Sequence, residues 1–313
     1  MAEAIGLDIG GTKIAGFRVR EDGRVQDRRT VSTPASDSDA TVDAAIAIAK
    51  ELASDDVRAV GIGAAGMVDH HDVVRYSPNL SYRNLPIGGR VGEALGLPCV
   101  ADNDANAAAW GEFRVGAGRD VDDMLLVTIG TGIGGGIVSG GRLIHGANGF
   151  AGEIGHIIVE PDGPLCGCGN RGCWEQVASG TAVERNGKLA AVQHPGSLLA
   201  ALADGDPDRV TGRTVTEAAR RNDDVALGIL AEVGRRLGEG MAGLVNVLDP
   251  QLVVAGGGAV EAGELLLGPA RAAFRQAVEA PEYRPDVPVR AAALGNDAGG
   301  IGAALIALEE ASS

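Results

Sequence analysis

The sequence predicts an α/β protein built from two similarly organised halves. Strand-like and helix-like segments alternate along the chain, which is typical of a largely parallel sheet covered by helices. A pattern of apolar strand, glycine turn and second strand occurs near residue 8 and returns near residue 130. The 313 residues are about twice the common domain size. We therefore expect a duplicated layout with domains at 1–112, joined by the C-terminal helix 299–313, and at 113–298.

The first half shows its elements through apolar spacing and turn residues. Gly10-Gly11 supplies the tight turn between its first two strands. Apolar positions three and four residues apart predict the first helix, with Ser38 or Asp39 as its N-cap. In order, we expect two strands within 5–19, a helix over 39–54, strands at 58–64 and 97–102, and a short helix over 105–110.

The second half repeats the opening and then becomes more helical. Thr214 and Glu217 have the spacing of a capping box that opens a helix. The polar segment 195–214 before that helix is expected to be an exposed loop. The other expected elements are two strands within 125–138, a helix over 224–248 ended by Asp249-Pro250, a strand at 252–255 and a final helix over 299–310.

Composition excludes several classes of protein. Apolar residues make up 45% of the chain and charged residues 22%, a balance that supports a folded core and excludes a wholly disordered chain. The formal net charge is −15, so a phosphate backbone would be repelled and nucleic acid is not an expected partner. No stretch approaches the ~18 apolar residues of a spanning helix. We expect a cytoplasmic protein without a membrane partner.

One cluster has the composition and spacing of a metal site. His156, Cys166, Cys168 and Cys173 form a Cys3His set within a glycine-rich segment. Four such ligands suit tetrahedral zinc in a structural role, because they leave no open coordination position. The alternatives are a disulfide, which a cytoplasmic chain disfavours, and unrelated buried thiols, which the crowding disfavours. Cys99 lies in an apolar strand and is interpreted as a small core residue.

Three glycine-rich turns follow apolar strands and suggest a phosphate ligand. Backbone N–H groups of such turns can hold phosphates with no side chain in the way, assisted by threonine and lysine. The sequence has neither the Walker A spacing nor the dinucleotide fingerprint in its usual context. The residues concerned are Gly10, Gly11, Thr12 and Lys13, then Gly130, Thr131 and Gly132, and finally Gly256, Gly257 and Gly258.

Carboxylates and amides follow the strand at 97–102. Asp102, Asn103, Asp104 and Asn106 are placed where α/β sheets bind ligands, although one of them can also serve as a helix N-cap. Convergent carboxylates and amides suit the hydroxyl groups of a neutral sugar. Further candidates for this role are Asn79, Glu153 and Glu175.

Taken in order, these motifs resemble those of the ROK family sugar kinases, and within that family the bacterial ATP-dependent glucokinases. The resemblance extends from residue 5 to about residue 300. It is carried by Asp8-Ile-Gly-Gly-Thr-Lys13, Gly63-Ala-Ala-Gly-Met-Val-Asp69, Asp102-Asn-Asp-Ala-Asn106, Gly130-Thr-Gly-Ile-Gly-Gly-Gly136, Gly152-Glu-Ile-Gly-His156 and the cysteine motif that ends at Glu175.

The resemblance implies the actin-like ATPase (ribonuclease H-like) fold, with two duplicated α/β domains around a cleft that holds ATP, Mg²⁺ and sugar. It implies that Asp8 lies near the Mg²⁺, that the first two glycine turns bind phosphates and that Gly256–Gly258 lies on the adenosine side. His156 would use one ring nitrogen for the structural Zn²⁺ and the other for the sugar. The remaining sugar contacts would come from Gly66, Asn79, Asn103, Asp104, Glu153 and Glu175.

The activity implied is transfer of the ATP γ-phosphate to the 6-hydroxyl of glucose, with Asp104 preferred over Asp102 as general base. Alternatives are another hexose or aminosugar (mannose, fructose, N-acetylmannosamine or N-acetylglucosamine), polyphosphate as donor, and a protein that binds sugar without transfer. A sugar-responsive DNA-binding regulator is disfavoured, because the chain is acidic and reaches the first strand by residue 5. A homo-oligomer, dimer or tetramer, is also expected, and the helix near 225–248 can serve either an interface or the core.

Overall fold

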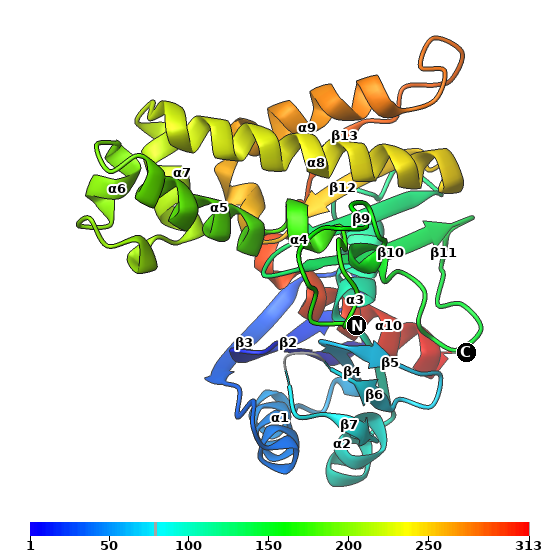
Figure 1. The fold of residues 1–313 in the computed structure, drawn as a ribbon. Coiled ribbons are helices and arrows are strands. Elements are labelled where there is room, and N and C mark those ends of the chain that lie inside the picture. Colours follow the sequence, from blue (N-terminus) through cyan, green and yellow to red (C-terminus); the bar gives the residue numbers. More distant parts are fainter. Residues whose placement is uncertain (78–79, 313) are drawn as a thin grey trace. The chain divides into compact units, whose positions relative to one another are not determined.

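The computed structural model describes residues 1–77 and 80–312 (Figure 1). The chain divides into two compact units. Unit 1 comprises Met1–Leu126, Gly135–Gly152 and Ala292–Ser313, and unit 2 comprises Val127–Gly134 and Glu153–Ala291. The domain boundary that the sequence predicts after residue 112 stays a prediction.

Two five-stranded sheets have the same strand order. The first runs β3-β2-β1-β4-β8 and the second β11-β10-β9-β12-β13, so each places its strands in the order third, second, first, fourth, fifth. In the first sheet β1 to β3 pair antiparallel, while β1, β4 and β8 pair parallel. The predicted duplication of layout is therefore confirmed. The strands are β1 (Glu3–Ile9), β2 (Lys13–Arg20), β3 (Val25–Ser32), β4 (Val57–Ala64), β8 (Cys99–Asn103), β9 (Met124–Ile129), β10 (Ile133–Ser139), β11 (Arg142–Leu143), β12 (Leu252–Gly256) and β13 (Val289–Ala291).

Helices cover both faces of the first sheet. Alternation along β1 directs Ile5, Leu7 and Ile9 into a core that also contains Ile48 of α1 and Val91 of α2. The opposite face carries α3 and α10, which pack against β4 and against each other. The helices of unit 1 are α1 (Ser38–Leu52), α2 (Ile87–Leu95), α3 (Asp104–Val115) and α10 (Ala298–Ser312). A small sheet adds β5 (Met67–Val68), β6 (Val74–Tyr76) and β7 (Arg83–Leu85).

Glycines allow α10 to approach the sheet backbone directly. A methyl group at Gly6 would overlap the carbonyl of Gly300, and one at Gly61 would overlap that of Ala303. On the other side of α10, a methyl group at Gly302 would overlap the carbonyl of Ala107 in α3. These positions lack side chains because main chain occupies the space that a Cβ atom would need.

Unit 2 is mostly helical. The long helix α8 packs along α9, and Gly238 of α8 lies against the main chain of Ala270. Trp174 is fully buried against Gly240, and its Nε1 donates to the carbonyl of Arg236 at 3.0 Å. The α-helices are α4 (Glu175–Ala178), α5 (Gly180–Gln193), α6 (Leu198–Leu202), α7 (Gly212–Arg220), α8 (Asp224–Leu248) and α9 (Glu264–Ala277). The short 3-10 helices among the described residues are η1 (Ile154–His156), η2 (Pro207–Arg209), η3 (Gly258–Ala262) and η4 (Gly295–Asp297).

The predicted N-caps of two helices were wrong by one to three residues. The N-cap of α1 is Asp37, whose carboxylate accepts from the N–H groups of Asp39 and Ala40 at 3.0 Å. The capping box of α7 joins Thr211 and Thr214, because this helix begins before the position that the Thr214–Glu217 pattern indicated.

The predicted exposed loop at 195–214 was also wrong. It contains α6, η2 and the start of α7. Leu199 and Val210 of this segment are fully buried and hold it on the core of unit 2. Among the helices of the described residues, none is long and apolar enough to cross a membrane.

We predict that Gly302→Ala destabilises the protein by about 3 kcal/mol, the upper end of the overpacking range, because the added methyl group meets backbone that cannot rotate away. Denaturation followed by circular dichroism measures the effect. Gly89→Ala in α2 is the matched control, since open space surrounds this position and alanine favours the helix by up to ~1 kcal/mol. Equal stability of the two variants would contradict the packing argument.

Candidate active site

In unit 1, strand register brings two carboxylates to one edge of the sheet. Asp8 of β1 is paired with Gly63 of β4, and Gly63 is paired with Asp102 of β8. Because these strands are parallel, the residues that follow Asp102 emerge at the same edge as the turn after Asp8. Gly63 has no side chain to fill the space between them, and a methyl group there would lie 3.5 Å from the Cα atom of Asp104. Asp8 and Asp104 are thus neighbours.

Within the polar run, Asn103 is the helix N-cap. Its Oδ1 accepts from the N–H groups of Ala105 at 2.8 Å and Asn106 at 3.1 Å. Its Nδ2 donates to the carbonyl of Gly66 at 3.0 Å, in the turn where Gly66 has a φ of 133°. Asn103 therefore fixes the start of α3 to the turn after β4. Asn79, also expected near the sugar, lies outside the described residues.

Asp102 and Asp104 have different surroundings. Asp102 is buried, and its carboxylate accepts from the Asn103 N–H, the Asn106 side chain and His145 at 2.7 to 2.9 Å. Asp104, the first residue of α3, accepts from the N–H of Ala105 at 2.9 Å. Three hydrogen bonds from the protein itself therefore hold the Asp102 carboxylate in the interior.

Burial changes the acidity of two of these carboxyl groups. The pKa of Asp8 is raised to about 7, mainly by burial and in part by the charge of Asp104, while Lys13 opposes the rise. Burial is also the main cause that raises the pKa of Asp104, and hydrogen bonds from the start of α3 counteract it in part. A carboxylate with a raised pKa is a stronger base than one exposed to water.

The glycine turns after β1 and β9 occupy the same place in the two units, between the first and second strands, and a backbone hydrogen bond of different spacing closes each turn. Gly10 donates its N–H to the carbonyl of Lys13 at 3.1 Å in unit 1, and Gly130 donates to Gly132 at 3.0 Å in unit 2. Gly11, Thr12, Lys13 and Thr131 are exposed.

The turn at 130–132 lies beside the N-terminus of α5. The N–H of Gly180 donates to the carbonyl of Gly130 at 2.8 Å, and the Thr181 hydroxyl donates to that of Thr131 at 2.6 Å. The positive end of this 14-residue helix favours an anion beside the turn.

The third glycine run also belongs to unit 2. Gly256 ends β12 and Gly258 begins η3. Between them Gly257 has a φ of 86°, and its Cα faces the backbone of Ile129 so closely that a methyl group would lie 2.6 Å from the Ile129 carbonyl oxygen. Only glycine fits this contact between the ends of β9 and β12.

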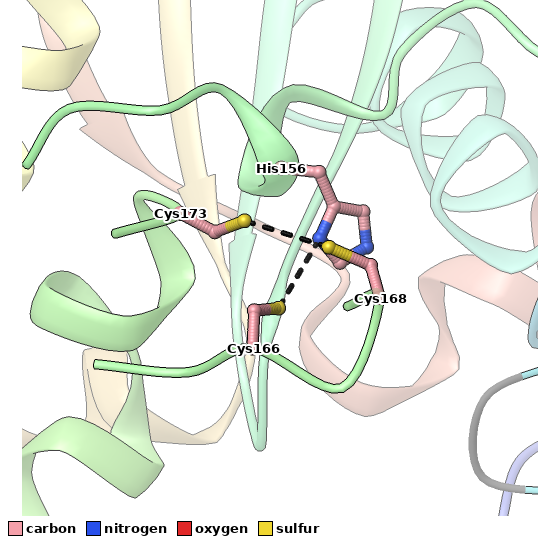
Figure 2. Close-up of side chains that lie close together, drawn as sticks. All are labelled: His156, Cys166, Cys168 and Cys173. Carbon is pink, nitrogen blue, oxygen red and sulfur yellow. Dashed lines mark hydrogen bonds between the residues drawn. The ribbon is translucent and has the colours of Figure 1, made fainter. Parts of the chain in front are cut away.

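The structure gathers the four predicted metal ligands (Figure 2). The ligand atoms of His156, Cys166, Cys168 and Cys173 all lie within 4.8 Å of one another. The Cys166 Sγ is 3.6 Å from the His156 Nδ1, and the Cys168 and Cys173 sulfurs are also 3.6 Å apart. Zinc–sulfur bonds of ~2.3 Å in a tetrahedron require sulfur separations of about 3.8 Å, so the donor set fits zinc. All four cysteines of the chain are free.

The ligand cluster lies next to two acidic residues. The second nitrogen of His156, Nε2, is 3.8 Å from a carboxylate oxygen of Glu153. On the other side of the cluster, the Cys166 thiol donates to Glu175 at 3.0 Å. A methyl group at Gly132 would overlap the Glu175 carboxylate. Unit 2 therefore brings together the predicted metal ligands, two predicted sugar ligands and the turn at 130–132 that is predicted to bind phosphate.

Sequence reasoning missed His145 and the role of Asn106. His145 contacts Asp102 although 43 residues separate them, and no local spacing signals such a pair. Asn106 was noted only as part of the polar run, whereas it is fully buried with its Nδ2 on Asp102.

Two α/β halves of equal strand order, each with a glycine turn after its first strand, define a member of the actin-like ATPase class of folds. The sequence profile of the ROK family matches residues 4–310, and the chain belongs to that family. It is 44% identical over 313 residues to a glucokinase of Streptomyces coelicolor, covering 99% of this chain and 98% of that protein.

Two further glucokinases are similar to this chain over nearly its full length. A glucokinase of Thermotoga maritima is 38% identical over 309 residues, which is 97% of each chain. A crystal structure of a ROK family glucokinase from Streptomyces griseus, in complex with glucose and AMPPNP, has a TM-score of 0.90 and 47% identity, covering 98% of this chain and 100% of that one.

We predict that Asp8→Asn raises the thermal stability of the metal-free protein at pH 8.5. The folded-state pKa of about 7 lies above the ordinary 3.8, so the native state loses stability as the pH rises between these values. A difference of about three between the two pKa values corresponds to at most ~4 kcal/mol. The neutral variant avoids this loss, and its gain should shrink at pH 5. Calorimetry in EDTA at both pH values measures it, and a variant less stable than wild type at pH 8.5 would contradict the burial argument.

Proposed function

We propose that this chain is a glucokinase that transfers the γ-phosphoryl group of ATP to the 6-hydroxyl of glucose. Family membership and close similarity to glucokinases support the proposal. The observation that carries it is the pair of neighbouring carboxyl groups, Asp8 and Asp104, at the sheet edge beside the Gly10–Lys13 turn. This arrangement supplies a base next to a phosphate-binding turn.

In the proposed reaction, Asp104 accepts the proton of the 6-hydroxyl while the hydroxyl oxygen bonds to the γ-phosphorus. The bond between that phosphorus and the β,γ-bridging oxygen breaks, and ADP leaves. The raised pKa of Asp104 suits it to this task, whereas Asp102 already accepts three hydrogen bonds from the protein. We therefore assign the base to Asp104.

The proposed sugar contacts are of two kinds. Carboxylates accept from sugar hydroxyls, and the Asn amides and the His156 ring can donate or accept. The Asn103 amide is oriented by its bond to Gly66, and the His156 ring by its position at the thiol cluster. The set comprises Gly66, Asn79, Asn103, Asp104, Glu153, His156 and Glu175.

We assign phosphate binding to the backbone of the turns at Gly10–Lys13 and Gly130–Gly132, and the adenosine side to Gly256–Gly258. Mg²⁺ bound with ATP would neutralise charge on the phosphates. Carboxylate oxygen is a ligand that Mg²⁺ prefers, so Asp8 fits a position near it. Lys13 adds a positive side chain on the same turn.

Sugar and donor selectivity are the points on which alternatives differ. A mispaired buried hydroxyl costs ~1–3 kcal/mol, so other hexoses, aminosugars and polyphosphate belong in the same assay. We also propose the cytoplasmic homo-oligomer that family membership implies, which light scattering of the purified protein tests.

We predict that Asp104→Asn lowers kcat for glucose by at least ~10²-fold, because the amide cannot accept the proton. ADP release in a coupled assay with ATP and Mg²⁺ measures kcat, and isothermal calorimetry should show that glucose still binds. Asp43→Asn, on the exposed face of α1, is the control for loss of one carboxylate. Near wild-type turnover by a folded Asp104→Asn protein would remove Asp104 from the base role.

We propose a structural zinc ion held by His156, Cys166, Cys168 and Cys173, and predict about one equivalent per chain by metal analysis. Cys168→Ser should lose the metal, lower the melting temperature and weaken glucose binding, because His156 and Glu175 contact the same cluster. Cys99→Ser, a cysteine of unit 1 outside the cluster, is the control and should retain the metal. Unchanged zinc content in Cys168→Ser would defeat this assignment.

A further inference from the structure

Asp102 and His145 form a hydrogen-bonded pair that the proposed reaction does not use directly. The Nε2 of His145 is 2.7 Å from the Oδ2 of Asp102. Asp102 is 7% exposed, whereas the His145 side chain is 36% exposed and follows β11 in the loop of unit 1 that runs to Gly152. A buried carboxylate paired with an imidazole is a strong, directional contact in a region of low dielectric constant.

The other oxygen of Asp102 contacts the residues on both sides of Asp104. Its Oδ1 accepts from the Asn103 N–H at 2.7 Å and from the Asn106 Nδ2 at 2.9 Å. Asn103 precedes Asp104 and caps α3, and Asn106 follows within the first turn of the helix. The orientation of the Asp102 carboxylate therefore fixes the backbone that carries Asp104.

The pair lies among acidic groups from several elements. Glu310 of α10, Asp72 of the β5–β6 turn and Asp102 of β8 face one another, and the charge of Asp102 adds to burial in raising the pKa of Asp72 and Glu310. The His70 ring meets that of His145 edge to face at 6.2 Å. The hydrogen bond with Asp102 is the main cause that raises the pKa of His145, against the opposing effect of burial.

We infer that His145 is a positioning residue for the phosphoryl transfer, because it holds the Asp102 carboxylate that orients Asn103 and Asn106 around Asp104. The hydrogen bond with Asp102 favours the protonated ring, whose positive charge offsets the negative charge of Asp102 beside the proposed base. The inference rests on the proposed function, since it assigns His145 a role through Asp104.

A purely structural role for His145 makes different predictions. The carbonyl of His145 accepts from the Ala151 N–H at 2.9 Å, and His70 contacts the Gly146 carbonyl at 3.0 Å, so backbone and His70 also anchor this loop. If the side chain only anchored the loop, its removal would lower stability without changing the acidic limb of the pH–rate profile. A positioning role changes kcat and that limb.

The test compares wild type with His145→Ala, His145→Gln and a control, His194→Ala, which removes an exposed histidine of unit 2. In His145→Ala we expect kcat for glucose to fall about ten- to a hundred-fold with KM for ATP unchanged, because the base is misaligned. Glutamine restores a hydrogen-bond donor without the charge. It should recover most of kcat at pH 8.5 while the acidic limb stays displaced to higher pH, as in the alanine variant.

The outcomes separate the two proposals. Wild-type turnover of glucose supports the proposed function whatever the variants do, and a wild type inactive on every sugar overturns both. With an active wild type, a His145→Ala protein with kcat within two-fold and an unshifted acidic limb overturns the inference alone. A loss well beyond a hundred-fold also overturns it, since His145 would then act on the reacting atoms. If the alanine variant does not fold, the displaced limb of His145→Gln decides.

Discussion

The position of the proposed catalytic carboxylates depends on close backbone contact between α10, the first sheet and α3. Gly6 and Gly61 admit the main chain of α10 on one side, and Gly302 admits that of α3 on the other. Because main chain contacts main chain here, no side chain can change conformation to let the elements shift. The backbone contacts therefore fix the relative positions of β1, β4 and α3. The same contacts therefore fix the positions of Asp8 at the end of β1 and Asp104 at the start of α3.

The same contact sets the electrostatics. A methyl group at Gly299 would lie 3.2 Å from the Asp8 carboxyl carbon, so α10 displaces water from this group and its pKa rises to about 7. Asp104 begins a helix, where the dipole and N–H donors favour the ionised form, yet its pKa is raised because burial outweighs them. Close backbone packing thus raises the pKa of two carboxyl groups. This burial destabilises the folded protein when no ligand is bound, and it suits the two groups to the proposed reaction beside the phosphates.

Local patterns in the sequence predicted the elements that depend on local physics. Strand-glycine-strand segments, the helix over 224–248 and the Cys3His set each combine close residues, and the structure places them as expected. The predictions failed where contacts between residues far apart in the sequence determine the structure. Leu199 and Val210 fold a polar segment onto the core, and Asp102 finds its partner His145 across 43 residues. The contact of Asp102 with His145 has no spacing that a single sequence can reveal. The Ser197 N-cap and the leucines of α6, by contrast, were a local signal that the polar composition of the segment outweighed in our prediction.

The burial pattern of the segment 157–174 supports the proposed metal site. Within it, all of it described, the regular pairing consists of two isolated bridges, Ile158 with Cys173 and Leu165 with Arg171. Cys166 and Cys173 are buried while Ile158 and Leu165 are more than half exposed, the reverse of the usual preference of apolar side chains. A segment that buries two of its thiols and exposes both isoleucines and its leucine buries little apolar surface besides Trp174. The proposed zinc would supply the missing cross-links, and through His156 and Cys166 it would fix the two residues that face Glu153 and Glu175.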